Sequence, residues 1–214
     1  MLEAGIKSDH DRLLKRANQA AAIDILARGL TEDENHADAL HAYNVKLNMC
    51  LRFNMDTTSI IETKVNIAAM YDGLGRVEDA IKKYEEILGQ RELLRRSLSP
   101  NNYFSVIYNM ITAYQGLRRY DEAASLLHGT VSEATSTLGA QHTMTLSLKK
   151  RCALAVLFKK EPGATREEGD DAIQTLEEVY RTMRRVLGEQ HPHTADSRKA
   201  LSCARANWAA RNQS

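Results

Sequence analysis

Two histidines flank a proline at His191-Pro192-His193, and they are the first candidates for chemistry in this sequence. Two imidazoles can bind a metal, but a zinc site needs further thiolate, imidazole or carboxylate ligands, and the local sequence supplies no such set. The three cysteines, Cys50, Cys152 and Cys203, lie far apart and have no CxxC spacing. We therefore predict neither a metal site nor a disulfide framework, and we interpret the histidine pair as a helix cap.

The segment Gly73-Leu74-Gly75 is another candidate, because glycine-rich loops can hold a phosphate group. A phosphate-binding loop also needs a following Lys-Ser or Lys-Thr pair, which is absent here. The sequence also lacks a GxGxxG after a strand, an HExxH and a GxSxG, the motifs of dinucleotide-binding enzymes, zinc proteases and serine hydrolases. We therefore interpret the glycines as a turn between helices, and we predict that the chain is not an enzyme and holds no cofactor.

The composition favours a globular, all-helical protein. Of 214 residues, 43% are hydrophobic and 27% are charged. Three prolines, eleven glycines and 6% aromatic residues are few for the turns and strands of a β-sandwich or barrel. The 29 basic residues nearly balance the 28 acidic ones, which argues against nucleic acid as a partner. We find no window that resembles a membrane span or signal peptide, so we expect a cytoplasmic protein without membrane insertion.

An internal repeat organises the sequence. Tyr71 and Ala80 recur as Tyr114 and Ala123, which gives a period of 43 residues. The pair Leu138-Gly139 recurs as Leu187-Gly188 with a spacing of 49, so the third unit carries about six extra residues near 159–169. We predict the following organisation: an N-terminal helical hairpin (1–56), three repeats (57–100, 101–143 and 144–193) and a C-terminal capping helix (194–214).

Within each unit, apolar residues follow the spacing of two amphipathic helices that a short turn joins into an antiparallel hairpin. The predicted pairs are 60–74 with 77–88, 103–117 with 120–138, and 145–158 with 166–187. Two further helices are expected at 9–28 and 35–53. Together with the cap, this gives nine helices stacked as an α-solenoid of antiparallel hairpins.

The repeat resembles the tetratricopeptide repeat. Its pattern of small and large residues is carried in one unit by Ile67, Ala68, Tyr71, Gly75, Val77, Ala80, Tyr84 and Ile87, and in the next by Met110, Ile111, Tyr114, Tyr120 and Ala123. Arg118 replaces the turn glycine found at Gly75. The longer period and the closing run Leu187-Gly-Glu-Gln-His191-Pro192-His-Thr194 are similar to the kinesin-light-chain subtype. The resemblance implies a right-handed superhelix in which the first helix of each pair lines a concave groove.

The resemblance also implies where a ligand binds. The sixth repeat position commonly projects into the groove, and here it is Asn66, Asn109 and, in the register of the Leu-Gly pair, Arg151. An Asn amide offers a donor and an acceptor to a peptide backbone, while Arg can fork onto a carboxylate or phosphate. Lys150 adds charge, so we expect an acidic or phosphorylated peptide segment. Alternatively, the asparagines are only tolerated at half-exposed helix positions.

From this pattern we expect a non-catalytic scaffold or adaptor that binds a peptide or helix of a partner protein in its groove. Two alternatives stay open. One is a structural subunit embedded in a large assembly, with the groove filled by a neighbouring subunit. The other is a peptide-gated regulator of an enzyme, for which Glu62, Asn66 and Asn109 are the candidate polar residues. The sequence does not predict the partner or the oligomeric state.

Overall fold

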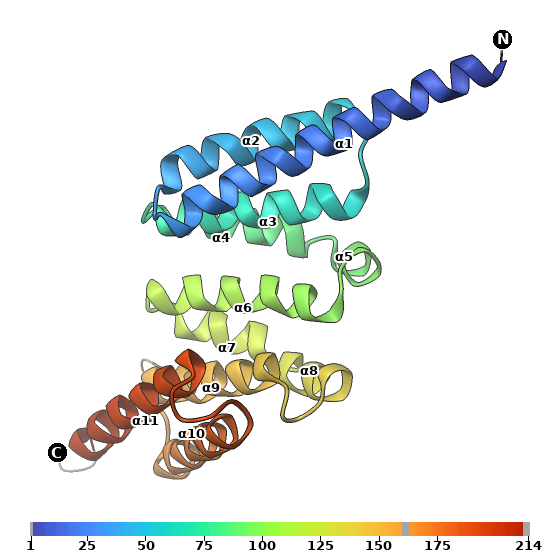
Figure 1. The fold of residues 1–214 in the computed structure, drawn as a ribbon. Coiled ribbons are helices and arrows are strands. Elements are labelled where there is room, and N and C mark those ends of the chain that lie inside the picture. The colour runs from blue at the N-terminus through green and yellow to red at the C-terminus, as the bar shows by residue number, and fades with distance from the viewer. Residues whose placement is uncertain (1, 160–162, 212–214) are drawn as a thin grey trace. The chain divides into compact units, whose positions relative to one another are not determined.

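The computed structural model describes residues 2–159 and 163–211, and within these ranges the chain is helical with no strand (Figure 1). Its helices are α1 (Leu2–Glu32), α2 (His36–Arg52), α3 (Thr57–Gly73), α4 (Val77–Leu88), α5 (Arg91–Ser97), α6 (Pro100–Gly116), α7 (Tyr120–Leu127), α8 (Thr130–Leu138), α9 (Thr143–Phe158), α10 (Arg166–Leu187) and α11 (Pro192–Arg211). None of these described helices is both long enough and apolar enough to cross a bilayer.

The all-helical class is confirmed, but the predicted number of nine helices is wrong, since eleven lie in the described part of the chain. The predicted helix 120–138 is divided into α7 and α8, because Gly129 has a φ of 78°, a left-handed conformation that ends a right-handed helix. The short helix α5 occupies the link after α4, where we predicted none. Of the predicted insertion near 159–169, residues 159 and 163–165 lie between α9 and α10, residues 166–169 form the first turn of α10, and residues 160–162 lie outside the described residues.

Hydrogen bonds at the helix starts repeat with the sequence period. The side chains of Asp56, Ser99 and His142 accept from backbone N–H groups at the starts of α3, α6 and α9. At the start of α11, His191 Nδ1 accepts from the N–H of His193 at 3.2 Å. Each cap satisfies a backbone donor that the first turn of a helix leaves without a partner. The interpretation of His191 as a capping residue is therefore confirmed.

The turns after the first helices also follow the repeat. Gly75 has a φ of 73°, and Arg118, one period later, has a φ of 57°. Both residues therefore adopt the left-handed conformation, which glycine tolerates and arginine adopts at a cost. The repeat geometry, rather than the local propensity of Arg118, fixes this turn.

The helices divide into two compact units, Met1–Ser97 and Leu98–Ser214. In unit 1, α2 packs between α1 and α3, and α4 packs on α3 (Figure 1). The core of this unit is a cluster of buried side chains in which alanines allow helices to approach closely: Ala27, Ala39, Ala42, Tyr43, Ile67 and Met70. An ion pair between Lys46 and Asp24 joins α2 to α1 beside this core.

In unit 2, α9 is the central helix and packs against α6, α7, α8, α10 and α11. A cluster of buried apolar side chains joins α9, α10 and α11, with Leu157, Leu176, Leu201 and Trp208 as its large members. Because α9 touches every other helix of the unit, its polar side chains are placed to contact several neighbours at once.

Candidate functional site

Arg151 links two first helices of unit 2. From α9, its Nη1 donates to Gln115 Oε1 at 3.1 Å and its Nη2 donates to Tyr108 Oη at 3.2 Å, both on α6. The guanidinium carbon also lies 5.2 Å from the centroid of the Tyr108 ring, a cation–π distance. In return, Gln115 Nε2 donates to the backbone oxygen of Arg151 at 2.9 Å. Three residues thus form a clasp, which we call the Arg151 clasp.

The Arg151 clasp leaves donors of the guanidinium unused. An arginine carries five N–H donors, and the Gln115 and Tyr108 bonds use two of them. The Arg151 Nε is buried and has no hydrogen-bond partner among the described residues. Because Nε is buried, a bound ligand does not reach it. The donors left for an acidic ligand group are the remaining N–H groups of Nη1 and Nη2.

Lys150 lies next to Arg151 in sequence but has a different environment. Its side chain is 2% exposed, and its ammonium forms an ion pair with Asp196 of α11. Burial by itself would raise the pKa of Asp196, but the hydrogen bond and charge of Lys150 outweigh it and lower that pKa below its ordinary value. The charge of Lys150 is therefore neutralised inside the protein, between α9 and α11.

The two predicted asparagines are half-buried, and neither side chain makes a hydrogen bond with another described residue. Asn109 directly follows Tyr108 on α6, so it belongs to the same helix as the Arg151 clasp. Asn66 lies on α3 in unit 1, which is described separately from unit 2. The structure thus places Arg151 in contact with Tyr108, the residue that precedes Asn109. The side-chain amides of Asn66 and Asn109 keep their hydrogen-bonding capacity.

Sequence reasoning missed Tyr108, Gln115 and Asp196. Tyr108 had a usable signal, because it lies one period of 43 residues before Arg151, whereas the register of the Leu-Gly pair had matched Arg151 with Asn109. The caps at Ser99 and His142 have the same spacing, so in the structure Arg151 matches Tyr108 and Asn109 matches Cys152. The sequence carries no comparable signal for Gln115 or Asp196. Their pairing depends on how neighbouring helices pack, which the repeat pattern does not specify residue by residue.

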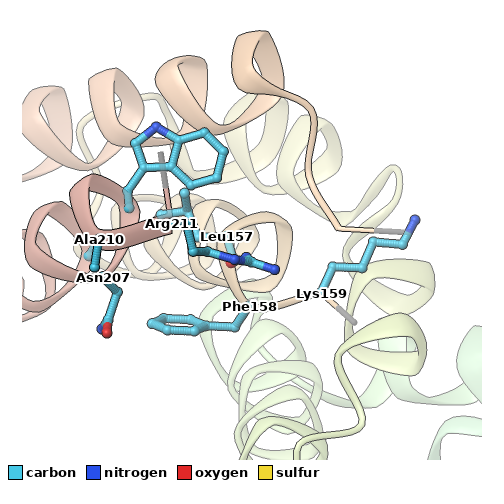
Figure 2. Close-up of a pocket in the computed structure, with 8 residues that line it drawn as sticks. Leu157, Phe158, Lys159, Asn207, Ala210 and Arg211 are labelled. Atoms are coloured by element: carbon cyan, nitrogen blue, oxygen red, sulfur yellow. The ribbon is translucent and has the colours of Figure 1, made fainter. Parts of the chain in front are cut away.

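A cavity of about 500 Å³ lies where the C-terminal ends of α9 and α11 meet (Figure 2). Phe158, Leu157 and Trp208 supply apolar walls, while Lys159, Asn207 and Arg211 supply polar groups. Phe158 is seven residues after Arg151, so the two side chains leave α9 on the same side. We call this the α9–α11 cavity.

Two interactions hold the walls of the α9–α11 cavity in place. Arg211 Nη1 donates to the backbone oxygen of Leu157 at 2.9 Å, which ties α11 to the end of α9. The Phe158 ring stacks on Tyr120 of α7, with centroids 5.9 Å apart. Aromatic walls with cations beside them suit an apolar side chain that is flanked by acidic groups.

Groups with the potential for covalent or metal chemistry are sparse in the described part of the chain. No three His, Cys, Asp or Glu side chains there gather in a way that could hold a metal ion. Cys152 is partly buried, and this burial raises the pKa of its thiol. A raised pKa reduces the thiolate fraction on which cysteine reactivity depends.

The stacked hairpins and the polar contacts between successive first helices define a helical-repeat protein of the tetratricopeptide type. In agreement, residues 164–193, which contain the whole of α10, match the family model of the tetratricopeptide repeat. The recognition of divergent tetratricopeptide repeats is therefore confirmed. No curated protein sequence matches the chain.

The fold is similar to that of a protein from Podosopora anserina described as a kinesin light chain with nearly identical TPR-like repeats. The TM-score is 0.66 at 19% identity, over 91% of this chain and 89% of that chain. BtubC (BKLC) from P. vanneervenii has a TM-score of 0.57 at 16% identity, over 98% of this chain and 87% of that chain. These likenesses concern the fold, and at that level the kinesin-light-chain-like character of the repeats is confirmed.

Proposed function

We propose that the protein is a non-catalytic interaction module that binds a peptide segment of a partner protein along its first helices. Asn66, Asn109 and Arg151 are the proposed polar contacts. The single observation that carries the proposal is the Arg151 clasp, which holds a guanidinium in a fixed orientation and uses only one N–H each of Nη1 and Nη2. A preorganised donor of this kind loses little conformational entropy when it binds an acceptor.

The proposed ligand is acidic or phosphorylated. Arg151 offers the unused donors, and Lys159 and Arg211 lie in the α9–α11 cavity on one side of α9. Carboxylates and phosphates accept strong, charge-assisted hydrogen bonds from such groups. Lys150 has an indirect role in this proposal, because its ammonium is occupied by Asp196 and holds α11 against α9.

The repeat boundaries and the groove belong to the same proposal. We retain three repeats, at 57–100, 101–143 and 144–193, between an N-terminal hairpin and a capping helix, stacked in a right-handed superhelix with a concave groove. The matching caps at Asp56, Ser99, His142 and His191 support these boundaries. We also retain a cytoplasmic location, which agrees with three cysteines that are free of disulfides.

A peptide-display selection tests the proposed function. A random peptide library is selected against the protein, and an enriched peptide is then measured by fluorescence anisotropy. We expect acidic or phosphomimetic peptides to be enriched, and we expect Asn109→Ala and Arg151→Lys each to weaken binding about fivefold to tenfold, because each removes hydrogen bonds to the ligand. Asn48→Ala is the matched control, since Asn48 is an exposed asparagine on a second helix. Equal affinity of all variants would remove these residues from the proposed site.

A second function, a subunit fixed in a large assembly, is favoured by one observation. α1 exposes large apolar side chains: Leu14, Ile25 and Leu26 are 53%, 69% and 59% exposed. An apolar helix face of this kind marks an interaction surface in many proteins. Mass photometry of the purified chain distinguishes the functions, because an adaptor stays monomeric on dilution whereas an assembly subunit forms larger species or requires its neighbours.

A further inference from the structure

A second cavity, of about 440 Å³, lies within unit 2 between α8, α9 and α10. From α9 it is lined by Lys149, Cys152, Ala153 and Val156. Successive helix residues are rotated by about 100°, so these positions lie on the opposite side of α9 from Arg151. The cavity is therefore separate from the Arg151 clasp and from the α9–α11 cavity.

The cavity has an apolar floor and a wall of carboxylates. Val131 of α8, Ala153 and Val156 of α9, and Ala172 of α10 form the floor. Along α10 the exposed side chains of Glu168, Asp171 and Glu178 form the wall. These three positions share one face of α10, because they are three and ten residues apart. We call this site the acidic cavity.

The carboxylates of the acidic cavity are only partly balanced by neighbouring cations. Hydrogen bonds to Thr165 and, to a smaller extent, the charge of Lys159 lower the pKa of Glu168. Asp171 and Glu178 make no ion pair with any residue that the structure describes, and Lys149 is the one cation among the described lining residues. Glu168 accepts a hydrogen bond from the backbone N–H of Thr165 at 2.8 Å and keeps its charge beside the N-terminus of α10. The site therefore carries an excess of negative charge over a floor of small apolar side chains.

The helix break at Gly129 contributes to this site. α7 ends at Leu127, the non-helical residues His128 and Gly129 follow, and α8 begins at Thr130, with Val131 in its first turn among the residues that line the cavity. An unbroken helix over 120–138, as the repeat pattern predicts, would carry this segment along the axis of α7. The break thus places an apolar side chain of α8 opposite the acidic face of α10.

We propose that the acidic cavity binds a basic amphipathic segment of a protein partner. An aliphatic side chain of the partner occupies the floor near Val131, Ala153 and Val156, and Lys or Arg residues on either side of it contact Asp171 and Glu178. Glu168 and Glu178 are ten residues apart, or about 15 Å along α10. A small cation cannot contact both, whereas a polypeptide segment can. This proposal does not rest on the proposed peptide site at Arg151. The acidic cavity lies on a different face of α9, and its proposed ligand is basic, whereas the ligand proposed for Arg151 is acidic.

The first test uses a defined probe. A short helical peptide of leucine and lysine, labelled with fluorescein, is compared with a peptide in which glutamate replaces lysine. We expect the lysine peptide to bind and the glutamate peptide not to bind, with affinity falling as salt rises, because exposed charges are screened. Absence of binding by the lysine peptide would overturn the proposal, and so would equal binding by both peptides.

The second test locates the binding. The double variant Asp171→Asn, Glu178→Gln is expected to weaken the lysine peptide about tenfold, since two charge contacts are lost. The control Glu78→Gln, Asp121→Asn removes the same charge from two exposed carboxylates elsewhere and should leave the affinity unchanged. Equal losses in the two double variants would show a general charge effect and reject the site. Because Arg151→Lys should not affect this peptide, failure here and failure of the proposed function are distinguishable.

A third measurement needs no change to the carboxylates. In a Cys203→Ser background, alkylation of Cys152 by a maleimide is followed by mass spectrometry with and without the lysine peptide. Cys203 is replaced because it is exposed and would react as well. We expect the peptide to slow the modification of Cys152 several-fold, because this thiol lies in the cavity lining. An unchanged rate at saturating peptide would place the binding elsewhere and overturn the proposal.

Discussion

At the scale of single residues, Trp208 requires that the residue it packs against, at position 169, be glycine. The indole of Trp208 packs against Gly169 of α10, and its Nε1 donates to Asp170 at 2.8 Å. A Cβ atom at residue 169 would overlap the indole ring. The glycine therefore makes room for the side chain that anchors α11, although glycine weakens a helix interior.

We predict that Gly169→Ala lowers the free energy of unfolding by about 1–3 kcal/mol, because the overlap with Trp208 exceeds the gain in helix propensity. Urea unfolding followed by circular dichroism measures the change. Gly116→Ala is the control, since nothing lies within 4 Å of a Cβ there and the substitution should be neutral or stabilising. A stabilised Gly169→Ala protein would contradict the close packing of Trp208.

At the scale of helices, a buried charge joins α9 to α11. Lys150 is 2% exposed, and Asp196 supplies its compensating charge. In unit 1, Lys46 is 6% exposed and pairs with Asp24 on α1. The two lysines are buried, whereas the Asp196 side chain is 60% exposed and the Asp24 side chain is 13% exposed. Loss of either aspartate leaves a buried ammonium without its compensating charge.

We predict that Asp196→Ala destabilises unit 2 by about 2 kcal/mol, because the buried ammonium of Lys150 loses its partner. Lys150→Met should cost less, since it removes the charge together with the need for a partner. Thermal unfolding of both variants and of the double variant provides the comparison. If Lys150→Met proved the more damaging change, the ion pair itself would be the main source of stability.

Asp24 and Asp196 also make the free energy of unfolding depend on pH. Hydrogen bonds from Lys46 and Arg28 outweigh the effect of burial and lower the pKa of Asp24, as Lys150 does for Asp196. A lowered pKa means that the contribution to stability is complete above the ordinary value of 3.8 and is lost as pH falls through the folded-state pKa. Burial raises the pKa of Asp72, which works in the opposite direction.

We therefore expect the urea midpoint to fall as pH decreases below about 4, with a shallower decline in the double variant Asp24→Asn, Asp196→Asn, whose amides do not titrate. Urea titrations at a series of acidic pH values give both curves. An identical slope in the two proteins would assign the acid sensitivity to other carboxylates.

At the scale of the whole molecule, the chain consists of two compact units, and stability in repeat proteins is close to a sum of local contributions. Trp208 is the one tryptophan of the sequence and lies in unit 2. Its fluorescence therefore reports local unfolding of that unit, while hydrogen exchange reports each helix separately.

We predict that Asp24→Ala, which leaves Lys46 buried without its partner, accelerates amide exchange in α1 and α2 by about tenfold or more. The Trp208 fluorescence midpoint should shift much less, because the change lies in unit 1. Hydrogen exchange with mass spectrometry and tryptophan emission are measured on the same samples. Equal shifts by both methods would show that the two units unfold as one.

The sequence by itself determined the repeat, most helices and the cap at His191. These features depend on local patterns: apolar spacing indicates helices, and a side chain just before a helix indicates a cap, whereas the caps at Asp56, Ser99 and His142 were found only in the structure. The same periodicity placed Asn109 and Arg151 on successive first helices. Such features follow from the sequence because each involves a few neighbouring residues, whatever the rest of the chain does.

Only the tertiary structure decided which polar side chains meet. The sequence placed Lys150 beside Arg151, but it did not predict that one would be buried against Asp196 and the other would clasp Tyr108 and Gln115. Nor did it predict that the helix would break at Gly129, beside the acidic cavity. The physical reason is that burial, charge compensation and cavity shape depend on helices brought together from distant positions in the chain, and a local pattern does not contain their packing.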